Sequence, residues 1–295
     1  MRIVVTGRQG QVALSLAERA ALHPGIEIVH LGRPEFDLSR PRTIAPAIAA
    51  ARPDIVVSAA AYTAVDQAED EPEAAFAVNA EGAGAVAAAA NEAGAPVIHL
   101  STDYVFDGSL DRPYREDDPT GPQGVYGASK LAGEGEVAAA NPRHLILRTA
   151  WVYSPFGRNF AKTMLKLAET RDRLAVVGDQ WGNPTSALDI ADAILLMVGT
   201  LNEDAPIAGI YNVVGEGSAT WADFARHVLS VSRAHGGPYA EVFDIPTSDF
   251  PTKARRPSNS RLSTERLARI FHHRLPDWRE SVEATISRLI SSPQT

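Results

Sequence analysis

Two side chains on one predicted helix could share an acid–base reaction. Tyr126 and Lys130 are four residues apart, so on a helix they lie one turn apart on the same face. A phenol titrates near pH 10, and a proton donor working near neutrality needs a pKa roughly 3 units lower, on the order of 4 kcal/mol. A nearby ammonium supplies much of this where water is excluded. The spacing therefore predicts a Tyr–Lys pair that protonates a carbonyl oxygen; the alternative is an accidental pair on a helix surface.

A hydroxyl that could polarise the same carbonyl follows a buried strand. The apolar run 95–100 reads as a strand buried on both faces, and Ser101, Thr102 and Asp103 follow it directly. In open α/β sheets, ligands bind at the carboxyl ends of the strands. We therefore expect Thr102 to donate a hydrogen bond to the carbonyl oxygen, with a simple turn cap as the alternative.

The N-terminal segment predicts a dinucleotide site. Residues 2–6 form a β-branched run, and a helical pattern begins after Gly7 and Gly10. Gly7 permits a tight turn, Gly10 lets the backbone approach a pyrophosphate, and the helix N-terminus faces the phosphates. We assign Gly7, Gly10 and Gln11 to cofactor binding. An ordinary strand–helix turn is the alternative, because this glycine spacing is looser than the strict fingerprint.

The second predicted strand, residues 26–31, bears on which cofactor binds. It leads into Gly32 and Arg33, and no carboxylate is present there to bind the adenosine ribose of NAD. Arg33, together with Arg8, could instead meet the 2′-phosphate of NADP, which favours NADPH and leaves NADH open. Either arginine could equally be a solvated loop charge. The cofactor-contacting residues predicted from the next segments are Asp37, Leu38, Ala59, Ala60 and Ala61.

The alternation of strands and helices predicts the fold. Further strands are expected at 54–58, 145–148 and 210–214, with an Ala-rich helix over 72–93. Five strands alternating with helices indicate an α/β protein with a doubly wound, Rossmann-like parallel sheet. Beyond Trp151 the rhythm changes to aromatic and polar loops between helices. We therefore expect a dinucleotide-binding domain over 1–150 and a smaller α/β substrate domain over 151–295, with some segments returning to the sheet.

Composition excludes several classes of function. The 295 residues carry a formal net charge of −8, which argues against nucleic acid as the main partner. There is no cysteine, which excludes disulfides, thiolate metal sites and a cysteine nucleophile. No metal-ligand spacing is present among the histidines. No leader pattern or apolar run of membrane-spanning length is found, so we expect a cytoplasmic protein without membrane contacts.

Longer strings point to one family. The glycine turn, Thr102 and the Tyr126–Lys130 pair resemble the extended short-chain dehydrogenase/reductases, and within them the chain resembles the dTDP-4-dehydrorhamnose reductases nearly end to end. The strings that carry this resemblance are AAAYTAVDQAE at 59–69, STDYVFDG at 101–108, RTAWVY at 148–153, DQWGNPT at 179–185 and RRPSNS at 255–260. Related dehydratases have Glu where Tyr104 stands here, so the resemblance favours simple carbonyl reduction.

The resemblance implies a role for each residue. Tyr126 would protonate the C4 carbonyl oxygen of a dTDP-4-dehydro sugar as hydride is transferred from the nicotinamide. Lys130 would hold the nicotinamide ribose and lower the Tyr126 pKa, and Thr102 would polarise the carbonyl. The substrate-binding residues implied in this way are Thr63, Asp103, Tyr104, Trp151, Asn159, Arg255 and Arg256. The expected reaction converts dTDP-4-dehydro-6-deoxy-L-mannose to dTDP-L-rhamnose for polysaccharide synthesis.

Three points stay open at the level of sequence. A reductase giving the other C4 epimer, a 6-deoxy-talose, fits the same strings. A non-catalytic, dinucleotide-binding regulatory subunit is the alternative of a different class, although the intact Thr102, Tyr126 and Lys130 set favours an enzyme. Finally, the resemblance is compatible with a homodimer, and some relatives use magnesium at a dimer contact, but Ser15 in the first helix gives no support for a metal here.

Overall fold

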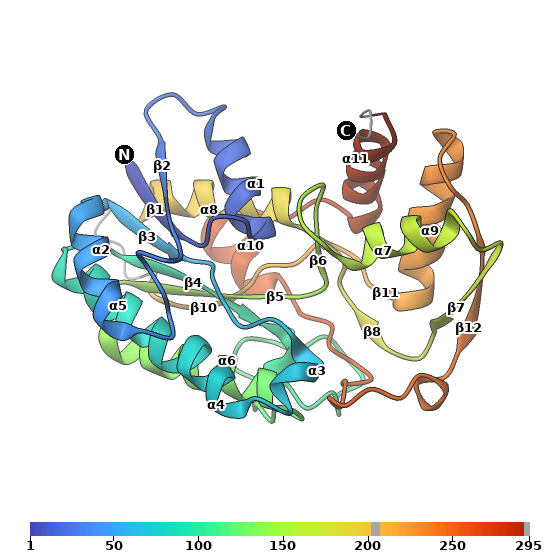
Figure 1. Ribbon diagram of the computed structural model, residues 1–295, viewed down its shortest axis with the longest axis horizontal. Coiled ribbons are helices and arrows are strands. Elements are labelled where there is room, and N and C mark those ends of the chain that lie inside the picture. Colours follow the sequence, from blue (N-terminus) through green and yellow to red (C-terminus); the bar gives the residue numbers. More distant parts are fainter. Residues whose placement is uncertain (202–206, 292–295) are drawn as a thin grey trace.

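A six-stranded parallel sheet forms the centre of the larger lobe (Figure 1). The computed structural model describes residues 1–201 and 207–291. In space the strands follow the order β2-β1-β3-β4-β5-β10, and every neighbouring pair is parallel. Their bounds are β1 (Arg2–Thr6), β2 (Glu27–Leu31), β3 (Ile55–Ser58), β4 (Val97–Thr102), β5 (His144–Thr149) and β10 (Gly209–Asn212). The predicted doubly wound parallel sheet is confirmed.

Helices cover both faces of this sheet, which explains why its strands are apolar without alternation. On one face, Ile3 and Val5 pack against α1 (Gln11–Ala20), α8 (Ala187–Thr200) and α10 (Glu265–Phe271). On the other face, Val4 and its neighbours pack against three more helices (Figure 1). These are α2 (Ile44–Ala51), α5 (Gly82–Glu92) and α6 (Val125–Ala140).

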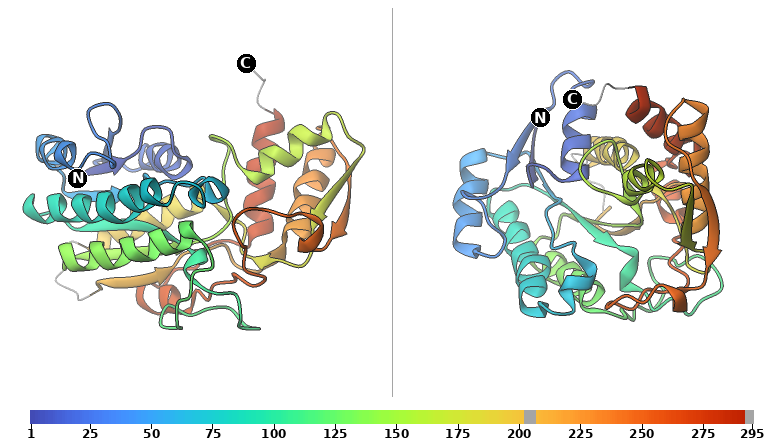
Figure 2. Two further views of the ribbon diagram at one scale, coloured as in Figure 1. Left: turned by 60° about the horizontal axis from the view of Figure 1, so that its bottom comes forward. Right: turned by 45° about the vertical axis from the view of Figure 1, so that its right-hand side comes forward.

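A second hydrophobic core lies in the C-terminal lobe (Figure 2). It is built on the parallel pair β7–β12 and packed by three helices. The elements are α7 (Phe160–Ala168), β7 (Arg173–Val177), α9 (Trp221–Ala234), β12 (Glu241–Ile245) and α11 (Trp278–Ser291). Because β10 is a strand of the sheet in the larger lobe, and α8 and α10 pack against that sheet, the chain crosses between the lobes more than once.

Short elements connect these parts. The predicted helix over 72–93 consists of α4, the π-helical segment η2 and α5 in direct succession. The connecting elements are η1 (Pro41–Thr43), α3 (Val65–Ala68), α4 (Pro72–Phe76), η2 (Ala77–Glu81), η3 (Asp103–Val105), β6 (Val152–Tyr153), β8 (Trp181–Gly182), β9 (Thr185–Ser186), β11 (Ala219–Thr220) and η4 (Thr247–Asp249). Within residues 1–201 and 207–291, no helix combines the length and apolarity needed to cross a membrane.

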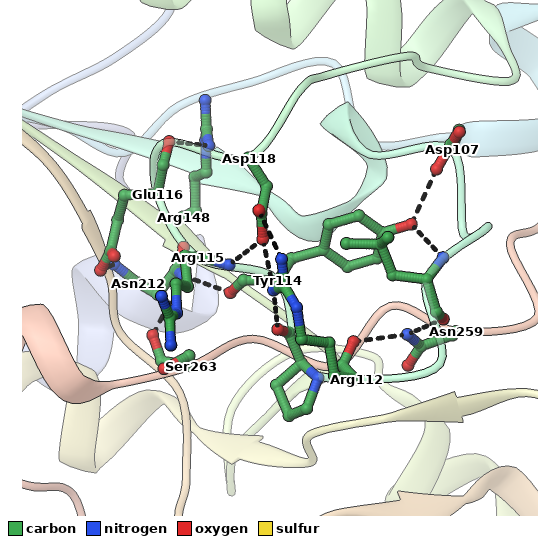
Figure 3. A network of polar contacts seen from close by, with 12 residues as sticks. Asp107, Arg112, Tyr114, Arg115, Glu116, Asp118, Arg148, Asn212, Asn259 and Ser263 are labelled. Carbon is green, nitrogen blue, oxygen red and sulfur yellow. Dashed lines mark hydrogen bonds and ion pairs between the residues drawn. The ribbon is translucent and has the colours of Figure 1, made fainter.

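The long polar loop after η3 is fixed to the sheet by hydrogen bonds (Figure 3). The Arg112 guanidinium pairs with the Asp118 carboxylate through two contacts of 2.7 Å. The Asn212 side chain of β10 donates to the Tyr114 carbonyl at 3.0 Å, and Arg148 of β5 donates to the Glu116 carbonyl at 3.1 Å. These hydrogen bonds therefore hold the loop in place beside the carboxyl ends of β5 and β10.

The topology places a ligand site between two strand ends. The chain leaves β1 toward β2 on one side and β3 lies on the other, so the strand order reverses between β1 and β3. Ligands of open α/β sheets bind in the crevice outside the strand ends at such a switch point. The loops after β1 and β3, at 7–10 and 59–63, are the loops at that position.

Candidate active site

The loops after β1 and β3 form one backbone surface. Gly7 has a φ of 98°, in the left-handed region, and a Cβ added there would lie 3.6 Å from the Ala60 side chain. The Thr6 hydroxyl accepts hydrogen bonds from the Ala59 and Ala60 amides, each at 3.0 Å. Ala59, Ala60 and Ala61 are half-buried. Small residues and a positive φ therefore let a flat ligand approach the backbone here, as expected for a dinucleotide.

Gln11 connects the glycine turn to the following lobe. Gly10 is the N-cap of α1, and Gln11 is its first residue. The Gln11 amide donates to the Val152 carbonyl at 3.2 Å, and its carbonyl accepts from Ser154 and Asn159 at 2.8 and 2.9 Å. Asn159 also caps α7 through the Lys162 amide at 3.0 Å. Gln11 and Asn159 thus lie together, with their polar atoms largely engaged by protein groups.

The predicted ribose end of the cofactor site contains two arginines on exposed loops. Arg33 is exposed, and its carbonyl accepts a hydrogen bond from Arg8 at 3.0 Å. Arg8 also pairs with Glu35 at 3.0 Å, so it holds the 33–35 segment in place. Its stem packs against Gly32, where an added Cβ would lie 2.9 Å from the Arg8 Cγ atom.

The side chains of Asp37 and Leu38 differ in their contacts and in their burial. The Asp37 carboxylate accepts from the Ser39 amide and hydroxyl at 3.0 and 2.8 Å. The Leu38 side chain is only 6% exposed and belongs to the core on the α2–α5 face. A cofactor contact of Leu38 would therefore come from its backbone, because packing already occupies the side chain.

Helix α6, which carries Tyr126 and Lys130, approaches its neighbours very closely. A Cβ on Gly127 would lie 2.1 Å from the Tyr104 carbonyl, and one on Gly133 would lie 2.0 Å from the Asn79 carbonyl. Only glycine permits these approaches. The buried Asn79 amide joins α6 to the loop after β3: it accepts from the Tyr62 amide at 2.8 Å and donates to Ser129 at 3.0 Å. Helix α6 is therefore fixed to the loop after β3 and to the segment that follows β4.

The N-terminus of α6 is capped from a distant segment. Its N-cap residue is Gly124, which has no side chain to offer. Instead the Glu69 carboxylate accepts from the Val125 amide at 2.8 Å. A carboxylate at this position also complements the partial positive charge of the helix N-terminus. Glu69 thus fixes the turn of α6 on which Tyr126 lies.

Tyr126 and Lys130 occupy one side of α6, as the spacing predicts, but their environments differ from the expectation. Burial raises the pKa of Tyr126 to about 12, with a further rise from the Asp103 charge and an opposing effect of the Thr102 hydroxyl. Burial lowers the pKa of the Lys130 ammonium to about 8, opposed by the Glu134 carboxylate. Lys130 donates to the Leu100 carbonyl at 2.5 Å, so its charge is directed partly toward β4.

Thr102 and Asp103 form a buried pair at the end of β4. The Thr102 hydroxyl donates to the Asp103 Oδ1 atom at 3.0 Å, and its oxygen accepts from the Tyr104 amide at 3.2 Å. Among the described residues, the Asp103 Oδ2 atom is buried without a hydrogen-bond partner. Burial raises the pKa of Asp103 to about 6. A buried acceptor without a partner is what a substrate hydroxyl would satisfy.

We expect Asp103→Asn to change how protein stability depends on pH. The Asp103 pKa is about 6 in the fold against 3.8 as its ordinary value, so the folded state binds the proton more tightly. Wild-type stability therefore falls as pH rises from about 4 to about 6, and the uncharged amide removes this loss. The stability of the variant relative to wild type should be greater at pH 7.5 than at pH 4, by at most about 3 kcal/mol. Urea unfolding at both pH values measures this, and a difference that does not vary with pH contradicts the prediction.

A small pocket lies beside Tyr126 and is lined by residues from several segments. Tyr104 meets Tyr126 edge to face, with ring centroids 6.0 Å apart. The exposed Arg255 lines this pocket, whereas Arg256 pairs with Asp66 at 2.9 Å. The full lining is Val65, Glu69, Tyr104, Gln123, Gly124, Tyr126, Gly127, Ala254, Arg255 and Pro257. The 254–257 segment, distant in sequence, therefore lines the same pocket as Tyr126.

Trp151 lies at the junction of the lobes in a constrained conformation. Its φ is 46°, and its ring stacks on Trp221 with centroids 3.5 Å apart and planes 7° apart. A Cβ on Gly182 would lie 2.4 Å from the Trp151 ring, so Gly182 also packs closely against that ring. Thr63, in contrast, is exposed in the loop before α3. The structure thus holds Trp151 rigidly and leaves Thr63 solvated.

Several residues of the site were not assigned roles by sequence reasoning. They are Ser58, Asp66, Glu69, His99, Glu134 and Trp221. Glu134 carried a signal, because it continues the series Tyr126, Lys130 at the same helical spacing. The others depend on contacts between segments far apart in the chain. Over the described ranges, histidine and carboxylate side chains form no group of three that could hold a metal ion, and Ser15 is buried in the core.

The fold and the site define the class of protein. A parallel sheet with a glycine turn after β1, a threonine at the end of β4 and a Tyr-x-x-x-Lys pair on the next helix characterise an extended short-chain dehydrogenase/reductase. The family model described as RmlD substrate binding domain matches residues 1–291. The chain belongs to the dTDP-4-dehydrorhamnose reductase family.

Similar proteins cover the chain almost completely. A dTDP-4-dehydrorhamnose reductase of Sinorhizobium fredii is 53% identical over 292 residues, 98% of either chain. A crystal structure of a dTDP-4-dehydrorhamnose reductase from Clostridium acetobutylicum superposes with a TM-score of 0.91 at 34% identity, covering 98% of this chain and 99% of that one. The enzyme from Bacillus anthracis, solved in complex with NADP, gives a TM-score of 0.90 at 34% identity, with coverage of 97% and 99%.

Proposed function

We propose that the protein reduces the C4 ketone of dTDP-4-dehydro-6-deoxy-L-mannose to give dTDP-L-rhamnose. The observation that carries this proposal is the convergence of Thr102, Tyr126 and Lys130 at the end of β4, beside a surface suited to a dinucleotide. Relatives that cover nearly the whole chain bear the corresponding name. A nicotinamide dinucleotide, when bound, supplies the hydride for such a reduction.

The roles of the three catalytic residues follow from their surroundings. Thr102 directs its hydroxyl to the carbonyl oxygen once it leaves Asp103, and Tyr126 donates the proton to that oxygen. Lys130 is buried and donates to the Leu100 carbonyl of β4, and its ammonium group also serves the cofactor ribose and the phenol. For donation, a high Tyr126 pKa is useful because it keeps the phenol protonated at neutral pH. The alkoxide produced at C4 is a stronger base than a phenolate, which drives the transfer.

The two lobes divide the binding tasks. Residues 1–150 provide the glycine turn, the alanine loop and the catalytic helix, and we assign the cofactor to them. Residues 151–295 contribute Trp151 and the 254–257 segment, and we assign the nucleotide sugar mainly to these. Arg255, exposed at the small pocket, is suited to the diphosphate, and Arg256 is held nearby by Asp66.

Turnover with the ketosugar tests the proposed reaction. Oxidation of NADPH and NADH is followed at 340 nm with dTDP-4-dehydro-6-deoxy-L-mannose, and the sugar product is identified by NMR. We expect dTDP-L-rhamnose. Formation of the talose epimer would replace the proposed stereochemistry, and tight cofactor binding without oxidation of either cofactor would indicate a non-catalytic subunit.

Arg33→Ala tests the preference for NADPH. If Arg33 meets the 2′-phosphate, its loss removes one charge-assisted contact at an exposed site. We expect kcat/KM with NADPH to fall about tenfold and kcat/KM with NADH to change less than twofold. Arg42→Ala, which removes an exposed arginine of η1, is the matched control. An equal loss with both cofactors would exclude Arg33 as the phosphate contact.

A further inference from the structure

A buried histidine lies directly behind the catalytic lysine. His99 is 1% exposed on β4, and its Nε2 atom is 3.3 Å from the Lys130 Nζ atom. Lys130 itself is 3% exposed, and its second acceptor is the Leu100 carbonyl at 2.5 Å. Two of the three ammonium donors are thus engaged by adjacent residues of one strand. One N–H group is left for the ligands of the site.

The chemistry of this contact fixes the state of the histidine. An ammonium can only donate, so the His99 Nε2 atom must carry a lone pair, and the ring proton must reside on Nδ1. Nδ1 lies 3.1 Å from the Ser58 hydroxyl oxygen, which accepts a hydrogen bond from the Nδ1–H group. Burial, together with the Lys130 charge, holds the pKa of His99 well below its ordinary value, which agrees with a neutral ring.

The sheet itself aligns this chain of contacts. Ser58 and His99 are direct partners in the parallel pairing of β3 and β4. His99 lies two residues after Val97, on the face that α5 and α6 cover, so its ring is directed at α6. The other charged groups around the pair are Glu134 on α6 and Arg148 on β5, which neutralises Glu134 at 2.7 Å. His99 is therefore a neutral hydrogen-bond acceptor among buried charged side chains.

We propose that His99 is a positioning residue that holds Lys130, through the Ser58–His99–Lys130 contacts, in its charged form and in the orientation that serves Tyr126 and the cofactor. The geometry assigns the strand pair β3–β4 a second part in the reaction: besides placing Thr102, it holds Lys130. This inference rests on the proposed reductase function, and it specifies which groups behind the active site maintain it.

His99→Leu removes the acceptor, and His99→Gln supplies an amide oxygen near the Nε2 position. In His99→Leu the ammonium loses a hydrogen-bond acceptor, so its deprotonation becomes easier. We expect the basic limb of the kcat/KM pH profile to move down by about one pH unit, and His99→Gln to restore most of the shift. Ser58→Ala, a small change that folding tolerates more readily, should shift the limb in the same direction by less, because the Nδ1–H tautomer loses its partner.

A direct titration separates this proposal from the proposed reaction. In protein labelled with ¹³C at lysine Cε, the Lys130 signal is assigned by its absence in Lys130→Met, and its titration midpoint is compared among wild type, His99→Leu, His99→Gln and Ser58→Ala. A midpoint lowered in His99→Leu and restored in His99→Gln supports the proposal even if the ketosugar is not turned over. Unchanged midpoints, or an equal loss of activity at every pH in both His99 variants, would overturn it. Where His99→Leu does not fold, the Ser58→Ala midpoint decides.

Discussion

We expect Tyr126→Phe to lower kcat by about 10² to 10⁴-fold while NADPH binds with nearly unchanged affinity. The magnitude is that of losing a positioned general acid. The phenol lies within hydrogen-bonding reach of the Thr102 hydroxyl at the end of β4, and phenylalanine keeps the ring that packs edge to face against Tyr104. The site therefore stays assembled and loses only the proton. Single-turnover kinetics with saturating cofactor and ketosugar, together with fluorescence titration of NADPH, separate the two effects.

Tyr62→Phe is the matched control for this experiment. Tyr62 lies in the loop after β3, and its hydroxyl donates to Glu71 at 2.8 Å in an exposed position. Its removal should change kcat less than threefold, because surface hydrogen bonds contribute little. If Tyr126→Phe retained more than a tenth of wild-type kcat, another group would be the proton donor and the assignment of Tyr126 would be wrong.

The sheet and its ligand-bearing edge could be predicted because their signals are local. Each strand is a short apolar run followed by a turn, and all six expected strands occur within two residues of the predicted bounds. Parallel strands bring their carboxyl ends to one edge, so Gly7, Ala60 and Thr102 could be placed together without knowing a single contact. The Tyr126–Lys130 spacing depends only on helix geometry.

What could not be predicted depends on contacts between distant segments. Leu38 was predicted to contact the cofactor because it follows the second strand, and the structure adds that its side chain fills the core against α2 and α5. The pKa of Tyr126 was expected to fall because Lys130 is near. It rises instead, because burial and the Asp103 charge outweigh the hydrogen bond from the Thr102 hydroxyl. The spacing of residues along the chain predicts neither the packing of the Leu38 side chain nor the raised pKa of Tyr126.

We expect the largest change in stability from breaking the buried ion pair of Arg148 and Glu134. Arg148 on β5 donates to both Glu134 oxygens on α6, at 2.9 and 2.7 Å, and both side chains are at most 5% exposed. Glu134 also accepts from Ser101 at 2.6 Å, just before Thr102. Arg148→Met would leave the carboxylate buried without its cation. We expect the free energy of unfolding in urea to fall by about 3–5 kcal/mol.

The double variant Arg148→Met with Glu134→Leu shows what the pair itself contributes. Two apolar side chains of similar volume leave no uncompensated charge, so most of the lost stability should return. Arg173→Met, which breaks an ion pair whose side chains are each 67% exposed, should cost less than about 1 kcal/mol and serves as the surface control. If Arg148→Met cost no more than that control, the buried pair would not be what fixes α6 to the sheet. If the double variant regained stability but not turnover, the charges would serve to align Lys130, one helical turn before Glu134, and not to hold the fold together.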